Sequence, residues 1–375
     1  MGKVAKILGI LAGIFVLLLA ASVYVGYLAL KKFAPNANTS MPAELEKARI
    51  TDGTGKLEKT SFYADASLGT ITEMRRDAGS LAIIGTRSAV FLDGKKAVQR
   101  RVSFPTNMQL GPVELIEMSG AAEPFFLGRG SWSTPVMFLD SSGKELWRYG
   151  GSPGVDYAAA GDLTGEGKVE VAVGMNGGGG ILLLDANGNR IWSKPDGNVW
   201  HVEILQGGSG IPGRILHSNV DGQLIVRDPH GNVLERHALD MYLSDFSLTR
   251  WNGEPEATHI VASDSDTVYV YTQYGQSVAR FESPAPQIYN DIRAVTVTYS
   301  NGSTYFAVVR RYRPWGRSIL TINSVKGGHG DLEYREIFED ACDTLLTAPS
   351  GDGQALLVGC RGAVFQYDVP RSPPN

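Results

Sequence analysis

FLDSSGKELWRY, residues 138–149, and LLDANGNRIWSK, residues 183–194, repeat one pattern: an apolar strand, an acidic turn with a glycine, and a second strand. Turn glycines recur at Gly94, Gly143, Gly188, Gly231 and Gly275. They lie 49, 45, 43 and 44 residues apart. A period of about 40–50 residues built from β-strands is typical of a propeller, in which each repeat folds as one four-stranded blade. The sequence therefore predicts an all-β fold.

Seven such repeats fill the chain between residues 81 and 368, as short runs rich in β-branched residues bounded by Gly, Asp, Asn and Ser. First strands are expected at residues 71–74, 113–118, 157–161, 201–206, 246–251, 294–299 and 344–348. Second strands are expected at 81–85, 124–128, 169–174, 214–217, 259–263, 305–309 and 355–359. Third strands end at Asp93, Asp140, Asp185, Asp228, Thr272, Asn323 and Asp368. The pattern predicts a seven-bladed propeller over residues 51–369.

The seventh repeat stops after its third strand, residues 364–368. Its fourth strand is expected at the other end of the propeller, because the turn at 52–56 and the run at 57–62 resemble the turn and outer strand of DSSGKELWRY. A strand over 56–63 would close the ring and leave no open sheet edge between the first and last blades. A linker that feeds this strand arrives on the face carrying the first-to-second and third-to-fourth turns.

Residues 7–30 carry no charge. As a helix they span roughly 36 Å, enough for a bilayer core of about 30 Å. This length favours an uncleaved anchor within residues 1–32, since the apolar run of a signal peptide has about 7–15 residues. Ala20–Ser22 leaves a cleaved signal peptide as the alternative. The anchor would place the propeller in the periplasm or outside the cell, after a linker at 33–50 and before a disordered tail at 370–375.

The turn at residues 140–147 resembles the tryptophan-docking repeat of PQQ-type quinoprotein propellers. Trp192 repeats it, and Leu234 and Val278 take the place of the tryptophan in the next two copies. Residues 158–174, AAAGDLTGEGKVEVAVG, resemble an FG-GAP repeat of the integrin α type. The two resemblances imply the propeller fold. They do not imply quinone binding, because quinoprotein dehydrogenases usually have eight blades and this chain has seven repeats.

The FG-GAP resemblance also implies a calcium loop. The matching positions are Asp162, Thr164, Glu166, the carbonyl of Lys168, and Glu170. Calcium takes six to eight oxygen ligands, and carboxylates on alternate residues of a tight loop can converge on one ion. Thr164 is a weaker ligand, and Glu replaces Asp twice, so a plain hairpin turn is the alternative.

Cys342 and Cys360 lie at equal distances from the turn at residues 350–353. This spacing makes them cross-strand neighbours, where a disulfide can form if the geometry suits. An oxidising compartment favours the bond. Two buried free thiols are the alternative.

Polar residues stand at or just before the starts of the inner strands: Asp156, His201, Asp245, Asp291, Arg293, Asp340 and Asp343. Inner strands line the centre of a propeller, so these side chains are candidates for a ring at the channel mouth. Such a ring could hold a cationic ligand or a metal. Solvated channel lining is the alternative.

Aromatic and arginine residues collect in the other loops: Arg129, Trp132, Trp200, Tyr242, Tyr289, Arg310, Arg311, Tyr312, Arg313, Trp315 and Arg317. Trp, Tyr and Arg are enriched at binding hot spots, which predicts a protein-binding surface centred on RRYRPWGR at 310–317. Cation–π packing inside a long loop is the alternative.

The net charge of −4 argues against a nucleic-acid-binding protein, and two cysteines are too few for a Cys-based zinc site. No Ser-His-Asp or Cys-His arrangement can be assigned, which favours a role other than catalysis. The sequence predicts a membrane-anchored extracytoplasmic propeller that acts as a protein-interaction or assembly scaffold. A ligand- or metal-binding sensor or enzyme at the channel mouth is the alternative.

Overall fold

The computed structural model describes residues 22, 24, 57–77, 79–105, 111–117, 123–129, 134–207, 211–251, 257–264, 267–282, 290–298, 304–312, 317–350 and 353–368. At residues 77, 290, 291, 298 and 312 only the backbone is described. The predicted linker and tail, and the predicted anchor except for Ser22 and Tyr24, lie outside these residues. Among the residues described, no helix has the length and apolar character needed to cross a bilayer.

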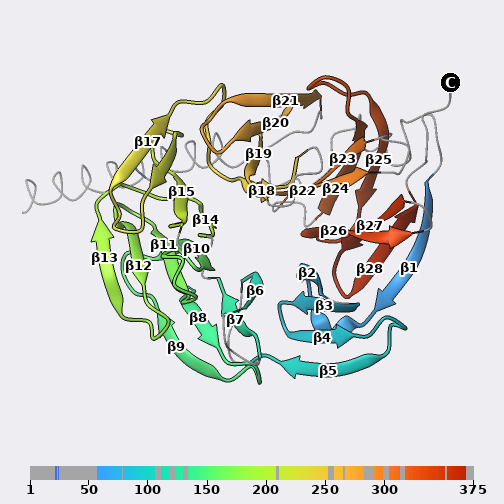
Figure 1. Ribbon diagram of the computed structural model, residues 1–375, viewed down its shortest axis with the longest axis horizontal. Helices are drawn as coiled ribbons and strands as arrows, with labels where there is room; N and C mark the ends of the chain where they lie inside the picture. The colour runs from blue at the N-terminus through green and yellow to red at the C-terminus, as the bar shows by residue number, and fades with distance from the viewer. Residues whose placement is uncertain are drawn as a thin grey trace, which may run out of the picture. The chain divides into compact units, whose positions relative to one another are not determined.

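Seven four-stranded antiparallel sheets are arranged in a ring around a central axis (Figure 1). The innermost strands are β2 (Ile71–Asp77), β6 (Val113–Ile116), β10 (Val155–Gly161), β14 (Val202–Leu205), β18 (Ser247–Thr249), β22 (Asn290–Thr298) and β26 (Thr344–Ser350). The second strands are β3 (Ser80–Gly85), β7 (Phe125–Gly128), β11 (Glu170–Met175), β15 (Arg214–Ser218), β19 (His259–Ser263), β23 (Thr304–Tyr312) and β27 (Gly353–Gly359). The predicted seven-bladed propeller is thereby confirmed.

The third strands are β4 (Ser88–Leu92), β8 (Val136–Leu139), β12 (Gly180–Leu184), β16 (Leu224–Arg227), β20 (Thr267–Thr272), β24 (Arg317–Ser324) and β28 (Ala363–Asp368). The outer strands are β5 (Val98–Ser103), β9 (Glu145–Tyr149), β13 (Arg190–Lys194), β17 (Val233–His237), β21 (Ser277–Glu282), β25 (Leu332–Phe338) and β1 (Glu58–Ala64). We number the blades one to seven from β2 onwards, so that β26–β28 and β1 form blade seven.

The hydrophobic core lies between blades. Phe138 of blade two packs in one cluster with Val171 and Val173 of blade three, and Leu216 of blade four packs with Ile260 of blade five. Strands such as β11 and β12 are buried along their whole length, whereas the outer strands are largely half-buried or exposed. A single blade cannot bury both of its faces, so the fold depends on the closed ring.

Tryptophan side chains connect blade two to blade three and blade three to blade four. Trp147 on β9 donates its indole N–H to the carbonyl of Ala186 in the next blade at 2.9 Å, and Trp192 on β13 donates to Pro229 at 2.8 Å. The Trp147 ring covers Gly188, which has a φ of +80° and where a Cβ would lie 2.8 Å from the indole. Both the left-handed conformation and this close approach require glycine.

The positions equivalent to these tryptophans in blades four and five differ from the prediction. On the outer strands, Trp147 pairs with Phe138 and Trp192 pairs with Leu183 of the neighbouring third strand. The residues that pair with the equivalent third-strand positions in blades four and five are Glu235 and Ala279. Leu234 and Val278 lie one residue earlier. A shift of one residue turns a side chain to the other face of the sheet, and Leu234 is accordingly exposed.

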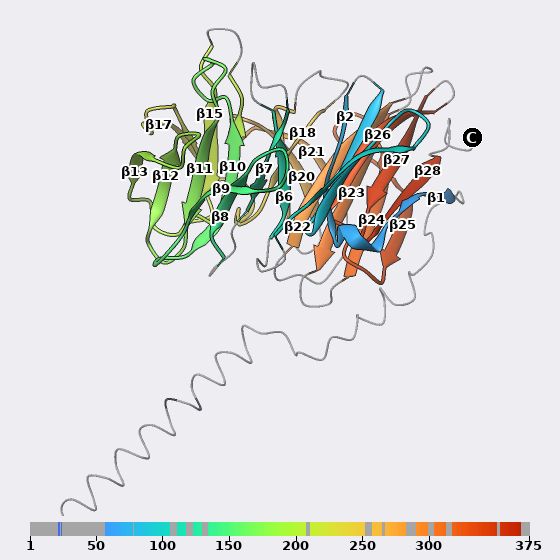
Figure 2. The same ribbon diagram turned by 90° about the horizontal axis from the view of Figure 1, so that it is seen from below.

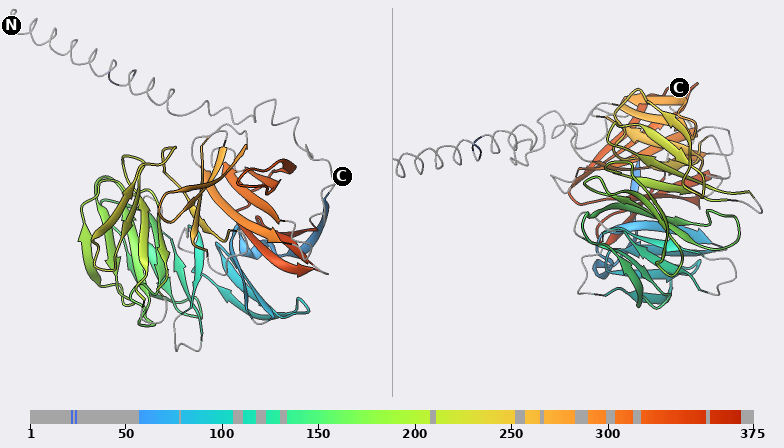
Figure 3. Two further views of the ribbon diagram at one scale, coloured as in Figure 1. Left: turned by 45° about the horizontal axis from the view of Figure 1, so that its top comes forward. Right: turned by 90° about the vertical axis from the view of Figure 1, so that its left-hand side faces the viewer.

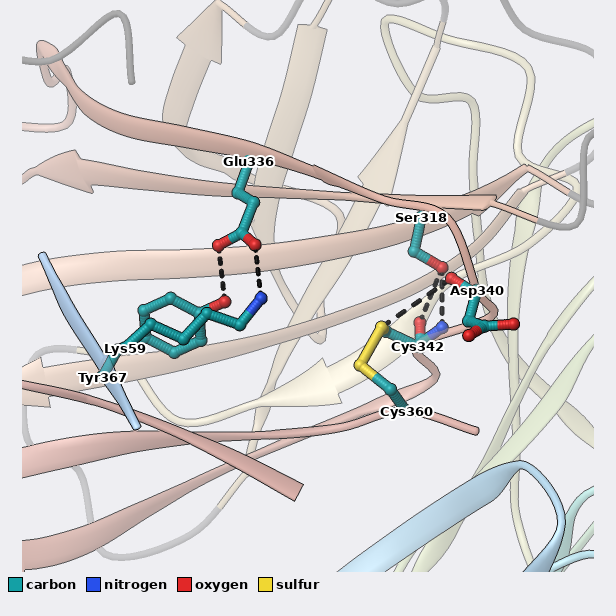
Figure 4. Close-up of a disulfide and its surroundings, with 7 residues drawn as sticks. All are labelled: Lys59, Ser318, Glu336, Asp340, Cys342, Cys360 and Tyr367. Carbon is teal, nitrogen blue, oxygen red and sulfur yellow. Dashed lines mark hydrogen bonds and ion pairs between the residues drawn. A yellow bond between two sulfur atoms is a disulfide. The ribbon is translucent and has the colours of Figure 1, made fainter. Parts of the chain in front are cut away.

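The ring is closed by β1, which pairs antiparallel with β28 from Glu58–Asp368 to Ala64–Ala363. Lys59 on β1 also reaches blade six, where its Nζ lies 2.5 Å from Oε1 of Glu336 (Figure 4). Tyr367 and Tyr334 donate hydrogen bonds to Oε2 of the same carboxylate. The Lys59 ammonium also lies 4.3 Å from the centre of the Phe365 ring, a cation–π contact. Lys59 thus connects β1 to blade six as well as to β28 of its own blade.

Cys342 and Cys360 form a disulfide, as predicted, and the alternative of two free thiols is wrong. Cys342 lies two residues before β26, and Cys360 directly follows β27. The Cys342 N–H donates to Oγ of Ser318 in blade six at 2.8 Å, and Ser318 donates to the Cys342 carbonyl at 3.1 Å (Figure 4). The covalent bond therefore lies at the contact between blades six and seven.

Replacing both cysteines by serine is expected to lower the free energy of unfolding by about 3 kcal/mol, because the bond closes a loop of 18 residues in the unfolded chain. Denaturant unfolding of the variant and the wild type, each with and without reductant, measures this. Reductant should destabilise the wild type to the level of the variant and leave the variant unchanged. Equal stability of the oxidised wild type and the variant would contradict the prediction.

Candidate functional site

The ring has two faces, and the strands run between them (Figures 2 and 3). We call the face formed by the second-to-third-strand loops and the connections between blades the loop face. The opposite face, formed by the first-to-second and third-to-fourth turns, is the turn face. The chain reaches β1 at the turn face, because Glu58 lies opposite Asp368, where the third strand of blade seven ends.

The loop predicted to bind calcium lies on the turn face between β10 and β11. The Asp162 carboxylate accepts backbone N–H bonds from Gly165 and Gly167 at 2.8 Å each, and Glu170 accepts one from Leu163 at 2.9 Å. Glu166 instead pairs with Lys168 at 2.9 Å. Within the described part of the chain, no three carboxylate, imidazole or thiol side chains are grouped to hold a metal ion.

Calcium binding at this loop stays a prediction. The carboxylates of Asp162 and Glu170 act as acceptors that fix a hairpin turn, and Thr164 donates its hydroxyl to Glu170 at 3.2 Å. This matches the alternative of a plain turn that retains the glycines. The loop shares residue types with the FG-GAP repeat, and in this structure the carboxylates of Asp162 and Glu170 accept backbone N–H groups of the loop itself.

Two arginines of the predicted binding surface are buried, so the expectation that they are exposed is wrong. Arg129 is 8% exposed and donates to the Tyr157 hydroxyl, and Arg310 is 1% exposed. Arg311 pairs with Asp343 at 2.8 Å, and Arg317 with Glu339 at 3.1 Å. Four further members, Trp132, Tyr289, Arg313 and Trp315, and the side chain of Tyr312 lie outside the described residues.

At the centre of the ring, His201 joins side chains from three blades. Its Nδ1 lies 2.5 Å from Oδ1 of Asp245, and its Nε2 lies 3.1 Å from Oε1 of Glu203. The imidazole packs between the rings of Tyr157 and Phe246, with centroid distances of 3.8 and 4.5 Å, and is fully buried. Burial by itself lowers the pKa of His201, but Asp245 and Glu203 together raise it above its ordinary value.

Tyr157 extends this cluster across the axis. Its hydroxyl accepts hydrogen bonds from Arg129 of blade two and, at 3.1 Å, from Arg293 of blade six. Burial raises the pKa of Glu114 on β6 to about 7, with Arg129 opposing the shift and Glu73 and Glu203 adding to it. We call His201, Asp245, Glu203, Tyr157, Arg129 and Arg293 the central cluster. Its charges are directed at one another.

The residues predicted at the channel mouth lie in more than one place. The structure brings His201, Asp245 and Arg293 into the central cluster, where His201 is buried and not a solvated lining residue. Asp156 instead accepts a hydrogen bond from Asn198 at 2.9 Å, and Asp343 lies with Arg311. The side chain of Asp291 lies outside the described residues, and Asp340 is exposed.

The sequence analysis missed Glu203, Tyr157 and Glu114. A signal for Glu203 was present, because residues two apart on a strand point to the same side, and Glu203 follows His201 by two. Tyr157 and Glu114 stand on predicted inner strands and could have been found in the same way. Their contacts with one another depend on the ring, which brings blades two to six together.

Three large apolar side chains are exposed together on the loop face. Trp200 lies between β13 and β14, Val220 between β15 and β16, and Tyr242 between β17 and β18, with exposed fractions of 37, 47 and 54%. Tyr242 donates its hydroxyl to the Val220 carbonyl at 2.9 Å, and its ring covers Gly222. Val220 also contacts Gly197, which belongs to the loop of Trp200. We call these three residues the apolar patch.

Sequence analysis predicted two members of the apolar patch, Trp200 and Tyr242. Val220 was not predicted, because valine is not among the residue types enriched at binding hot spots. The signal was a valine at the tip of the turn Asn219–Gly222, where polar residues are usual. Exposed aromatic and aliphatic side chains on neighbouring loops can bury apolar area against another protein.

Neither a protein-family model nor a curated protein sequence matches the chain. The chain is similar in structure to two crystal structures of BBS1N in complex with ARL6DN, one soaked with mercury and one with lead. Their TM-scores are 0.53 and 0.55 at 14% identity, covering 84 and 87% of this chain and 98% of each BBS1N chain. BamB from Moraxella catarrhalis aligns with a TM-score of 0.45 at 17% identity, over 80% of this chain and 85% of that one. At 14% identity, the likeness to the two BBS1N structures shows the β-propeller fold alone.

Proposed function

We propose that the protein is a scaffold that binds a partner protein on the loop face, and that an N-terminal anchor holds it in a membrane outside the cytoplasm. The observation that carries the binding role is the apolar patch, in which Trp200, Val220 and Tyr242 are exposed on three adjoining loops. Large apolar side chains that cluster on a soluble surface mark interaction sites more often than chance exposure does.

The central cluster supports this choice over a sensor or enzyme at the channel mouth. His201 is fully buried, and its two ring nitrogens face Asp245 and Glu203. Arg129 and Arg293 both donate to Tyr157. Side chains that pair across blades in this way hold the blades together at the axis, and their main effect is on the stability of the ring.

The fold offers a precedent for the binding role. BBS1N, which shares the propeller fold, was crystallised in complex with ARL6DN. The uncharged residues 7–30 support membrane anchoring, since a helix of that length can span a bilayer. Because β1 begins at the turn face, the proposal has the loop face directed away from the membrane.

Site-specific crosslinking in intact membranes tests the binding role. A photoreactive amino acid at Val220 is expected to give an adduct with a partner, and the same amino acid at Ile191 on β13, which is also half exposed, is expected to give little. Adding Trp200→Ala and Tyr242→Ala should reduce the Val220 adduct at least about fivefold, since hot-spot residues dominate binding energy. Absence of an adduct at Val220, or equal adducts at both positions, would overturn the proposal.

A further inference from the structure

We infer that the partner segment bound by the apolar patch is basic, with lysine or arginine alternating with apolar side chains. This inference rests on the proposed function and specifies the chemistry of the partner. Three observations carry it. The loops that hold the apolar patch contain carboxylates, two of these carboxylates are exposed and form no ion pair with a described basic side chain, and the loops are ordered by their own hydrogen bonds.

The loops around the apolar patch are acidic. Residues 195–201, 219–223 and 238–246 contain Asp196, Asp221, Asp240 and Asp245 and no lysine or arginine. The chain as a whole has 35 lysine and arginine residues and 39 aspartate and glutamate residues, so the excess of acidic residues in these loops is a local feature. A basic segment laid across these loops would meet complementary charge, which speeds association and selects the partner.

Two of these carboxylates are available to a partner. Asp196 pairs with Arg227 and His217, and Asp245 pairs with His201. Asp221 and Asp240 are exposed, and no ion pair joins either of them to a described basic side chain. Asp221 follows Val220 directly, and Asp240 lies two residues before Tyr242. Each of these carboxylates is therefore one or two residues along the chain from an exposed apolar side chain.

The loops are fixed before a partner arrives. Oδ1 of Asn219 accepts the N–H groups of Asp221 at 3.1 Å and of Gln223 at 2.9 Å, and the Leu243 N–H donates to the Gly222 carbonyl at 3.0 Å. The Ser218 N–H donates to the His201 carbonyl at 3.0 Å, and this bond connects the end of the loop that holds Trp200 to the end of β15. A surface that is already ordered loses little conformational entropy on binding.

The same charges argue against other occupants of the loop face. Arg236 on β17 reaches these loops, where its Nη1 donates to Oε1 of Gln223 at 3.1 Å. Anionic lipid headgroups and nucleic-acid phosphates would face Asp221 and Asp240 beside this arginine, with no lysine or arginine in the three loops themselves. A partner segment with carboxylates would be repelled in the same way. A basic amphipathic polypeptide satisfies both the apolar side chains and the free carboxylates.

Binding of defined peptides to the purified full chain tests this chemistry. The probes are a short lysine–leucine peptide, a glutamate–leucine peptide and a lysine–serine peptide of the same length, measured by calorimetric titration. The lysine–leucine peptide is expected to bind tightest, and raising the salt from about 50 to about 300 mM should weaken it several-fold. Equal affinities for the lysine–leucine and glutamate–leucine peptides would overturn the inference.

Variants locate the site. Asp221→Lys with Asp240→Lys, and separately Trp200→Ala with Tyr242→Ala, should each weaken the lysine–leucine peptide by at least about tenfold, or about 1.4 kcal/mol. The matched control is Glu117→Lys with Asp331→Lys, which makes the same change of charge at exposed positions on the turn face. Equal weakening by the control would show nonspecific attraction and overturn the inference.

The crosslink at Val220 separates this inference from the proposed function. If the native adduct forms and survives Asp221→Lys with Asp240→Lys undiminished, the scaffold role stands and the basic partner is wrong. If no adduct forms at Val220, the scaffold role itself fails. An adduct that is lost on charge reversal but retained in the turn-face control supports both.

Discussion

A chain that lacks residues 57–64 is expected to aggregate instead of folding to a stable monomer. Removal of β1 exposes the edge of β28 and the side chains of blade seven that β1 covers, and an unpaired strand edge is a template for intermolecular pairing. It also removes Lys59, whose ammonium contacts Glu336 and the Phe365 ring. Because the core lies between blades, an opened ring loses the contacts that bury both faces of its last blade.

Size-exclusion chromatography and thermal unfolding of the truncated and full-length propellers measure this effect. A synthetic peptide of residues 57–64, supplied in excess, should restore part of the monomer, because it can pair with β28 in the same register. Lys59→Gln should destabilise the intact protein by about 1–2 kcal/mol, and Lys326→Gln, which alters an exposed lysine on the turn face, by less than about 0.5 kcal/mol. A soluble, cooperatively unfolding monomer without β1 would contradict the role given to it.

The repeat pattern predicts the propeller because its signals are local. Turn residues such as Asp140 and Gly143 act within a few positions, and Oδ1 of Asp140 does accept the N–H groups of Ser142 and Lys144 that fix the turn. Short apolar strands between such turns leave few alternatives to a meander. The cysteine pair was predictable for the same reason, since its geometry depends on one hairpin.

Residue type alone does not indicate where a side chain lies, and the site predictions failed on this point. Arg129 and Arg310 were chosen as hot-spot residues, yet both are buried. Arg129 is stabilised there by Tyr157, which comes from the next blade. The central cluster combines blades two to six, so no stretch of sequence contains it. The apolar patch was predicted in part, because Trp200 and Tyr242 belong to the residue types enriched at binding hot spots and Val220 does not.

Asp245→Ala is expected to lower the free energy of unfolding by about 4 kcal/mol near pH 6, because it leaves the buried imidazolium of His201 without its closest counter-charge. The pKa of His201 is raised in the folded protein above its ordinary value of 6.5, chiefly by Asp245 acting against the effect of burial. A group of this kind stabilises the fold fully below its unfolded pKa, and the contribution disappears as the pH rises through the folded pKa. The penalty for Asp245→Ala should therefore be smaller at a second, alkaline pH above the folded pKa of His201, where the imidazole has lost its charge.

Denaturant unfolding at the two pH values tests this prediction, with Asp240→Ala as the control, since its exposed carboxylate should matter by less than about 0.5 kcal/mol at either pH. The sharper test repeats Asp245→Ala in a His201→Phe background, where a phenyl ring can occupy the space between Tyr157 and Phe246. There the loss of Asp245 should cost at most about 1 kcal/mol, because no buried cation remains to be compensated. A penalty that is the same at both pH values, or the same with and without His201, would mean that Asp245 stabilises the axis by packing, and the ionic account of the central cluster would be wrong.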